Sequence, residues 1–576
     1  MTVFFWPDMI PLKSLFRLRI LTHVKEDPMF KILSLSLLAL FAVNVLGRVE
    51  VSQQGDLINY EFSDLSISTE NLTIEGSEFI RTKLVGADDY EAILFELGMP
   101  EIPVIRFYAP QGEVEVVLGD EKDFGQPKGL AMDLVPNLES LEKIKGSTRK
   151  LIINKSFQKS SAYYPAKKFE ISNGGTTNGN QEQLITVYPL TWNPSSKSIK
   201  LVKNFQVIVK PAVQEQTKSL EVETMVFVIG GQFKNSPAIA QYENFKKQLG
   251  FNVVRIIVEG SVNTPEAIRT KLQELLKSTN LKYALIFGDA EHVPAKKSNI
   301  ISGVTDHFYA AIDTNNYAQD INGPDIGVGR VTIKNETELQ NVVDKFIKYQ
   351  TTNFTTDEWL SNASFLATND RYTVAEGSHN YVIDSFMTNH GYSGIFPNAA
   401  QPGGDKLYAI TYRVKNEQVI NAISAGRSII DYSGHGATTF WDAPRFTQAN
   451  VRDLNHSAAL PFVISNACIT GQFTVNESFA ETWIKHPHGA IMFWGSMDST
   501  YWDEDDFLER DTFKGIFELK KATFSEITHY GLKELWRRYN GQNRAAYYWE
   551  TYLTFGDPSI KLKVNGNQDF LAEVLP

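Results

Sequence analysis

The sequence has very little cysteine: Cys468 is the single one among 576 residues. One thiol cannot form an intramolecular disulfide, so cross-links within the chain are excluded. An unpaired cysteine is either a buried, inert side chain, which is common for free thiols, or a reactive group. The choice between these two interpretations depends on the residues around it.

Clusters of basic residues are also missing. The formal net charge is −11, and no Lys/Arg-rich run occurs. Proteins that bind nucleic acid neutralise phosphates with clustered Lys and Arg, so we expect no nucleic-acid partner. The acidic residues are scattered, which is typical of a solvated surface. The sequence has no His-x-x-x-His spacing that would indicate zinc, and no EF-hand pattern.

Long apolar runs are nearly absent. The one clear run is Ile32–Leu46, preceded by Met29-Phe30-Lys31 and followed by Gly47-Arg48. Its length is typical of the core of a signal peptide and short for a membrane span, although a buried or anchoring helix is the alternative. We therefore interpret residues 1–47 as a leader and signal peptide, with Met1 or Met29 as the start. This predicts a secreted, extracellular protein without a stable membrane span after signal removal.

Two regions of different character follow the leader. Residues 48–215 consist of short alternating runs such as Glu113–Leu118 and Leu184–Tyr188, separated by turn residues, which predicts a β-rich domain. Gly174–Asn180 is interpreted as a loop tip within it. A polar linker at 216–224 leads to 225–565, where apolar strands alternate with helical patterns, and 566–576 form a tail. This alternation predicts a doubly wound α/β domain with a mostly parallel sheet.

Two chemically active side chains follow consecutive predicted strands of the α/β domain. The strand Ser428–Tyr432 runs into Gly434-His435-Gly436, and the strand Pro461–Ser465 runs into Asn466-Ala467-Cys468. Ligands of open α/β sheets bind beyond the carboxyl ends of strands, so both side chains can reach one crevice. A cysteine with a nearby histidine is the arrangement of a nucleophile and its base. This favours a reactive Cys468 over an inert one.

These motifs resemble the gingipain-type cysteine peptidases, peptidase family C25, which belong to the same clan as caspases and legumains. The clan is marked by apolar strands that run into His-Gly and Ala-Cys, as they do here. Further matching blocks are Ile286–Asp289, Ile326–Arg330, Gly489–Phe493 and Thr554–Ser559. The resemblance covers roughly residues 220–565 and implies a caspase-like sheet flanked by helices. It also implies that the β-rich domain is a propeptide.

The resemblance assigns roles to individual residues. Cys468 is the nucleophile and His435 the acid–base partner, with Asp370 hydrogen-bonded to the histidine; an Asx-turn residue is the alternative for Asp370. The N–H groups of Gly436 and Cys468 are the expected oxyanion donors. Trp502 matches an aromatic lid of the substrate pocket. Asp506, with Glu376 second, is the expected substrate contact, and an acidic wall would select Lys or Arg before the cleaved bond.

The expected function is a secreted cysteine endopeptidase that acts on proteins or peptides and is made as a zymogen inhibited by its own propeptide. A basic specificity would make Lys218-Ser219 a maturation site. A transpeptidase or ligase with the same Cys–His pair is the first alternative, and a non-catalytic secreted binding protein is the second. No cofactor is needed for the chemistry. Calcium is the structural ion that the resemblance implies, with five candidate ligands: Asp289, Asp306, Asp313, Asp320 and Asp325.

Overall fold

The computed structural model describes residues 49–85, 92–125, 133–177, 180–212, 222–354, 358–455 and 459–565. The leader, most of the linker and the tail lie outside these residues, and so does the expected maturation site at Lys218-Ser219. Within the described residues, no helix combines the length and the apolar character needed to cross a bilayer.

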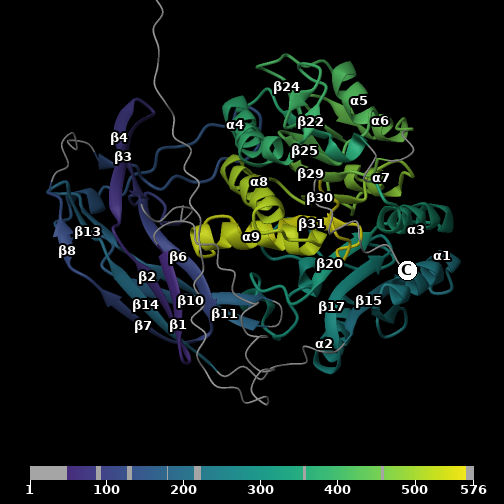
Figure 1. The fold of residues 1–576 in the computed structure, drawn as a ribbon, viewed down its shortest axis with the longest axis horizontal. Helices are drawn as coiled ribbons and strands as arrows, with labels where there is room; N and C mark the ends of the chain where they lie inside the picture. Colours follow the sequence, from purple (N-terminus) through teal and green to yellow (C-terminus); the bar gives the residue numbers. More distant parts are fainter. Residues whose placement is uncertain are drawn as a thin grey trace, which may run out of the picture. The chain divides into compact units, whose positions relative to one another are not determined.

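The β-rich part is built from four small sheets, drawn in purple and blue in Figure 1. All its strand pairs are antiparallel except β4 with β9. The sheets have the orders β1-β2-β14-β7, β10-β11-β6-β5, β12-β13-β8 and β3-β4-β9. Their strands are β1 (Val49–Gln54), β2 (Leu57–Phe62), β3 (Ser66–Ile74), β4 (Ser77–Val85), β5 (Ala92–Leu94), β6 (Ile102–Pro110), β7 (Gly112–Leu118), β8 (Glu121–Asp123), β9 (Asp133–Leu134), β10 (Phe169–Thr177), β11 (Asn180–Val187), β12 (Leu190–Asn193), β13 (Ser198–Val202) and β14 (Phe205–Pro211).

The expected strands of this part are present, but the loop expected at Gly174–Asn180 is shorter. Strand β10 continues to Thr177, with a register shift between Asn173 and Gly175. The left-handed backbone of Gly175 (φ +78°) allows the irregularity, and ladder pairing then extends past it.

The α/β part contains a ten-stranded sheet with the order β16-β15-β17-β20-β31-β30-β29-β25-β21-β24. All neighbouring strands are parallel except β30 and β31. The sheet therefore consists of two parallel halves that run in opposite directions. Its strands are β15 (Glu223–Gly230), β16 (Asn252–Val258), β17 (Asn280–Phe287), β20 (Gly327–Val331), β21 (Ala363–Ala367), β24 (Asp405–Tyr408), β25 (Ile429–Ser433), β29 (Phe462–Asn466), β30 (Met492–Ser496) and β31 (Tyr552–Phe555).

Helices cover both faces of this sheet, as strand β15 shows. Its residues Met225 and Phe227 belong to one apolar cluster with Ile239 of α1, whereas Val226 and Val228 belong to another with Ile268 of α2. A strand that is buried on both faces reads as a continuous apolar run. The longer helices are α1 (Pro237–Gln248), α2 (Pro265–Ser278), α3 (Glu336–Thr351), α4 (Tyr372–Val382), α5 (Asn416–Ser424), α7 (Phe479–Lys485), α8 (Trp502–Phe517), α9 (Phe524–Tyr539) and α10 (Ala545–Thr551).

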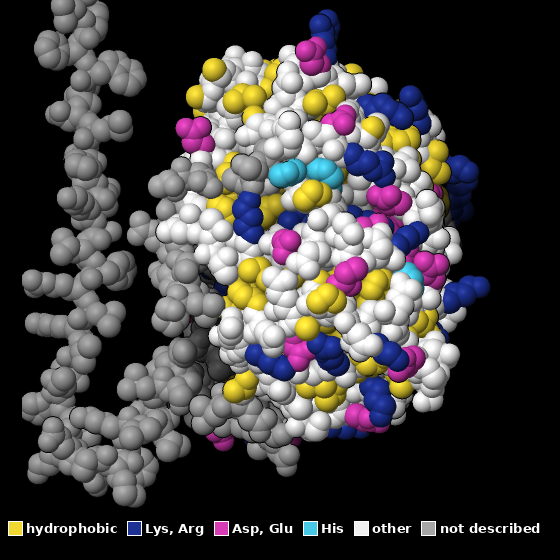
Figure 2. Space-filling view, turned by 90° about the vertical axis from the view of Figure 1, so that its right-hand side faces the viewer, with side chains coloured by type: hydrophobic (Ala, Val, Ile, Leu, Met, Phe, Trp, Pro, Cys, Tyr) yellow, Lys and Arg dark blue, Asp and Glu magenta, His cyan; other side chains and the backbone are white. Residues whose placement is uncertain are grey.

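The β-rich and α/β parts fall into one compact unit and contact each other directly. Buried Arg106 of β6 donates to the carbonyl oxygens of Arg537 and Arg538 at the end of α9, at 2.7 Å each. A cation at a helix carboxyl end satisfies carbonyls that lack helical partners. On the face seen in Figure 2, which carries α1 and α3, basic and acidic side chains are interspersed.

Candidate active site

Three neighbouring parallel strands place the predicted Asp–His–Cys set at one edge of the sheet. Strands β21, β25 and β29 pair side by side in the same direction. Asp370, His435 and Cys468 each follow the last residue of one of these strands within three positions. Because the strands are parallel and in register, their carboxyl ends bring the three side chains to a common crevice.

The imidazole of His435 is held between a carboxylate and an aromatic ring. Its Nε2 lies 2.9 Å from Oδ2 of Asp370, and its ring meets that of Trp502 edge-on with centroids 5.7 Å apart. Burial opposes the ionisation of Asp370, but the hydrogen bonds from His435 and from the N–H of Gly146 outweigh it and lower the pKa of the carboxyl. The carboxylate can therefore orient the ring and stabilise its protonated form.

Cys468 lies at a strained turn directly after β29. The next residue, Ile469, has φ of +51°, which is unfavourable for a β-branched side chain. The Sγ atom accepts a hydrogen bond from the N–H of Thr500 at 3.2 Å. Burial raises the pKa of the Cys468 thiol, although the Thr500 N–H and the charge of Lys143 act against this. The thiol therefore needs a base to lose its proton in the closed site.

The loops after β25 and β29 touch at Gly436. A Cβ atom there would lie 2.7 Å from the carbonyl oxygen of Cys468 and 2.9 Å from the Cβ of Ala467. Glycine at this position therefore lets the two loops approach, which keeps His435 near Cys468.

A lysine from the β-rich part occupies the crevice. The carbonyl oxygen of Lys143 lies 2.9 Å from Nδ1 of His435 and 3.9 Å from Sγ of Cys468. Among the described residues, the carbonyl oxygen of Lys143 contacts these two side chains and not the N–H groups of Gly436 or Cys468. The roles of those two N–H groups as oxyanion donors stay a prediction.

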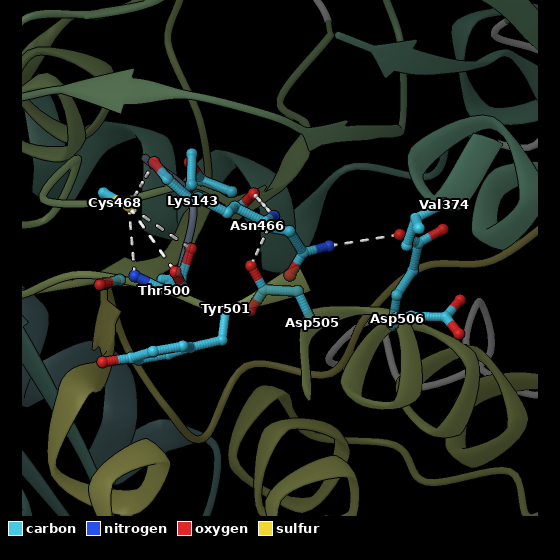
Figure 3. A network of polar contacts seen from close by, with 12 residues as sticks. Lys143, Val374, Asn466, Cys468, Thr500, Tyr501, Asp505 and Asp506 are labelled. Atoms are coloured by element: carbon cyan, nitrogen blue, oxygen red, sulfur yellow. Dashed lines mark hydrogen bonds and ion pairs between the residues drawn. The ribbon is translucent and has the colours of Figure 1, made fainter. Parts of the chain in front are cut away.

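The side chain of Lys143 enters a closed acidic pocket (Figure 3). Its Nζ lies 2.6 Å from Oδ2 of Asp505 and donates to the carbonyl oxygen of Asn466 at 2.6 Å. It also lies 4.7 Å from the ring centroid of Trp502. The side chains of Lys143 and Asp505 are 0% and 1% exposed, so the ion pair is fully desolvated. Buried charges are tolerated only with such close partners.

The backbone around Lys143 is bound as an added strand. Glu142 pairs antiparallel with Tyr501. The N–H of Lys143 donates to the carbonyl of Thr500, and the N–H of Trp502 donates to the carbonyl of Leu141, both at 2.9 Å. Main-chain pairing of this kind is how an extended peptide binds at a free strand edge.

Asp505, and not the expected Asp506, is the acid that contacts the side chain of Lys143. Asp506 instead accepts hydrogen bonds from Ser378 and from Arg510. Both acids lie in the first turn and a half of helix α8, where consecutive side chains point in different directions. Glu376, the second expected contact, accepts from the N–H and the hydroxyl of Thr411. Trp502 does line the pocket.

Lys143, Asp505 and Thr500 were not predicted from the sequence as residues of this site. The segment around Lys143 carries no motif, so nothing in the chain order connects it with Cys468, 325 positions later. Acidic residues are favoured in the first turn of a helix, so the run Asp503–Asp506 carries one signal for a helix start. Even in a helix, Asp505 and Asp506 lie three and four positions after Trp502, and both spacings bring side chains together. Spacing alone therefore does not choose between the two acids.

Three of the five expected calcium ligands come together elsewhere in the α/β part. Carboxylate oxygens of Asp313, Asp320 and Asp325 lie within 4.8 Å of one another. Burial and the neighbouring Asp313 raise the pKa of Asp320 to about 9, and burial raises that of Asp325 to about 7. Asp306 is instead paired with Arg330 through two contacts of 2.6 Å, and Asp289 lies 3.4 Å from Lys334.

One protein family and several known proteins match much of the chain. Residues 219–563 match the sequence profile of peptidase family C25. Gingipain R2 of Porphyromonas gingivalis is 25% identical over 455 residues, 70% of this chain and 59% of the relative. Lys-gingipain of the same organism is 22% identical over 572 residues, 87% of this chain and 32% of the relative. The chain thus spans about six tenths and one third of these relatives.

Solved structures show the same fold. The crystal structure of the Arg-specific cysteine proteinase gingipain R has a TM-score of 0.52 at 24% identity, covering 62% of this chain and 82% of that one. The complex of the pro- and mature domains of RgpB from Porphyromonas gingivalis has a TM-score of 0.50 at 25% identity, covering 59% and 79%. The expected caspase-like α/β fold behind a β-rich propeptide region is confirmed.

Proposed function

This chain belongs to peptidase family C25, and we propose that it is the latent form of a secreted cysteine endopeptidase that cleaves after lysine. One observation carries the proposal: Lys143 fills a closed acidic pocket while its carbonyl group lies against His435 and Cys468. A substrate lysine in the same pocket would present its own carbonyl to the nucleophile. In the nomenclature of peptidase subsites, Lys143 occupies S1, the site of the residue before the cleaved bond.

The pocket favours lysine over arginine because its contacts suit a point charge. One oxygen of Asp505 and the carbonyl oxygen of Asn466 each lie 2.6 Å from Nζ. The other oxygen of Asp505 already accepts from the hydroxyls of Tyr548 and Tyr552, at 2.8 and 2.6 Å. Guanidinium groups bind best to a carboxylate with both oxygens free, whereas an ammonium needs only single contacts.

The chemistry follows from the three side chains. His435 takes the proton of the Cys468 thiol, and the thiolate sulfur attacks the carbonyl carbon. The C–N bond then breaks, and the amine leaves with the proton from His435, which gives a thioester. Water attacks this thioester and passes a proton to His435, and the C–S bond breaks to restore the thiol. Asp370 keeps the imidazole oriented throughout.

The β-rich part inhibits this chemistry by occupying the site in an unproductive geometry. The Lys143 carbonyl oxygen is bound at Nδ1 of His435, one of the two nitrogens available to take the thiol proton, while Asp370 occupies the other. The chain then turns sharply, since the N–H of Ile144 donates to the carbonyl of Glu142 at 2.8 Å. Gly146 and Ser147 bind Asp370 and Arg371, which holds this turn against the site.

The first test uses the full chain, activated under reducing conditions, on fluorogenic peptides that differ only at the residue before the cleaved bond. We expect cleavage after lysine and none by Cys468→Ala. In Asp505→Asn, kcat/KM should fall by roughly 10²- to 4 × 10³-fold, because loss of a buried charge partner costs about 3–5 kcal/mol. Asp506→Asn is the matched control and should keep most activity. Equal cleavage after Lys, Arg and Ala would contradict the proposal.

The same experiment separates the alternatives. Capture of the acyl-enzyme by added amines in place of water would indicate a transpeptidase or ligase. A Cys468 thiol that resists peptide-based thiol reagents in the activated protein would indicate a binding protein on a peptidase fold. Retention of the protein in the cells that make it would contradict secretion.

We also propose that Asp313, Asp320 and Asp325 bind a calcium ion. Oxygen ligands suit Ca²⁺, and Oδ2 of buried Asp320 has no hydrogen-bond partner. A cation would compensate three neighbouring carboxylates that otherwise repel each other. We expect millimolar Ca²⁺ to raise the Tm of the full chain by several degrees, and a chelator to reverse it. Asp320→Asn should lose this response, whereas Asp344→Asn, a control far from the cluster in sequence, should keep it.

A further inference from the structure

The segment that precedes Lys143 contacts the peptidase part well beyond the S1 pocket. Counting back from Lys143, the positions are Glu142 (P2), Leu141 (P3) and Ser140 (P4). Leu141 and Ser140 are only 9% and 8% exposed. A segment of the β-rich part that is buried against the peptidase part is a template for what an extended substrate meets there.

Leu141 belongs to the apolar core of the peptidase part and not to that of the β-rich part. It is grouped with Tyr501, Trp502 and Tyr547 in the large cluster of the α/β region. The separate cluster of the β-rich sheets does not include it. The carbonyl of Leu141 accepts a hydrogen bond from the N–H of Trp502. The backbone pairing that positions Lys143 therefore also positions the side chain of Leu141.

Ser140 is bound by two side chains of the peptidase part. Its hydroxyl donates to Oε1 of Glu504 and also lies 2.8 Å from Oδ1 of Asn543. Glu504 is 0% exposed, and its second oxygen, Oε2, has no hydrogen-bond partner. The amide of Asn543 donates to the same Oε1, which fixes the carboxyl in place. Two side chains of the peptidase part thus contact this one hydroxyl and also contact each other.

We propose that Glu504 and Asn543 form an S4 subsite that selects a serine or threonine hydroxyl four residues before the cleaved bond, next to an apolar S3 subsite. The inference rests on the proposed function, since it names further features of that enzyme's substrates. A buried carboxyl left without its donor is costly, so a peptide that lacks the hydroxyl binds less well. A cavity of about 480 Å³ lies next to this contact and is lined by residues of both parts, among them Ser140 and Asn543.

The substrates are therefore extended segments of the form Ser/Thr–apolar–any–Lys. Recognition of the lysine alone uses one ion pair, whereas this set adds a polar and an apolar contact in fixed register. Sites built to hydrogen-bond a substrate group reject analogues that lack it. The enzyme would consequently cut a minority of the lysines in an unfolded protein efficiently.

The test measures kcat/KM of the full chain, after activation and active-site titration, on Ser-Leu-Glu-Lys and Ala-Leu-Glu-Lys fluorogenic peptides. We expect a preference for serine of about five- to thirty-fold, as for a hydrogen bond to a buried carboxyl. Glu504→Leu and Asn543→Ala should each reduce the ratio of serine-peptide to alanine-peptide cleavage toward one. Glu504→Gln should retain more of this serine-to-alanine ratio than Glu504→Leu does. Asp503→Asn, which removes the adjacent charge, should keep the ratio.

A second measurement uses the latent full chain. Ser140→Ala should shorten the lag before activity when Glu504 is present and have little effect in Glu504→Leu, because both substitutions remove the same contact. A serine-to-alanine ratio near one in an enzyme that cleaves lysyl peptides would overturn the S4 subsite and leave the proposed function standing. Failure to cleave any lysyl peptide would overturn both.

Discussion

At the scale of single residues, the site depends on a few buried polar contacts. Lys143 and Asp505 form an ion pair that is shielded from solvent, and Asp370 and His435 form a hydrogen-bonded pair with partial exposure. Such pairs stabilise a particular arrangement mainly because breaking them leaves a buried charge alone. Under the proposed function, the latent state should therefore depend most on Lys143, although the interface around it is much larger.

We predict that Lys143→Ala makes the full chain active without processing. The substitution leaves Asp505 uncompensated and frees S1, so the segment should leave the crevice, at a cost to docking of about 3–5 kcal/mol. The measurement is hydrolysis of a lysyl peptide by the intact chain, with electrophoresis to exclude cleavage. Lys145→Ala, an exposed lysine two positions on, is the control and should stay latent. A latent Lys143→Ala chain would show that other contacts suffice.

At the scale of elements, the site requires two loops at the ends of parallel strands to touch. β25 and β29 bring His435 and Cys468 to one edge, and Gly436 lets the loops close up. The strand direction reverses only between β30 and β31, one strand beyond β29. The strands that carry the site therefore all belong to the same parallel half of the sheet. The geometry of the candidate site is thus set by strand register and by a glycine at position 436.

We predict that Gly436→Ala lowers kcat/KM for lysyl peptides by at least about 10²-fold, because the new methyl group pushes the two loops apart and displacements near 1 Å have such effects. Gly377→Ala is the control, since a Cβ there meets nothing within 4 Å in helix α4. That change should keep activity and raise stability slightly, by about 0.5–1 kcal/mol. The measurements are kcat/KM for a lysyl peptide and the thermal unfolding of both variants. Equal kcat/KM values for the two variants would contradict the prediction.

At the scale of the whole molecule, consecutive acids at the start of α8 each hold a different part of the propeptide region. Asp503 pairs with Arg149, Glu504 binds Ser140, and Asp505 binds Lys143. Burial raises the pKa of Glu504 to about 8, above its value near 4.3 in an unfolded chain. The interface therefore contains a carboxyl that favours the protonated state.

This pKa gives a pH prediction with a definite sign. A carboxyl whose pKa is raised on folding contributes most to stability below its unfolded pKa, and that contribution is lost as pH rises toward about 8. The free energy of unfolding of the full chain should therefore fall between about pH 5 and pH 8 more steeply than that of Glu504→Gln. Glu518→Gln, an exposed acid at the other end of α8, should follow the wild type. Parallel curves for all three would contradict the prediction.

The sequence by itself determined the fold class and predicted the side chains that the structure brings together in the candidate site. Apolar runs alternating with helical patterns indicate a parallel sheet, because a strand covered on both faces has no polar side. Cys468 and His435 were found because each ends such a strand, so local sequence already fixes their place at the sheet edge.

Only the tertiary structure showed which residues meet at the candidate site, and the proposed specificity rests on those contacts. Lys143 reaches Cys468 from another part of the chain, and pairing between such distant segments leaves no periodic signal. The choice of Asp505 over Asp506 depends on the rotation of α8 about its axis, which is set by packing against α4 and α9 and not by the run of acids. The proposed specificity and latency depend on contacts between segments that are distant in the chain. A pattern of residues along the sequence does not show which of these segments meet.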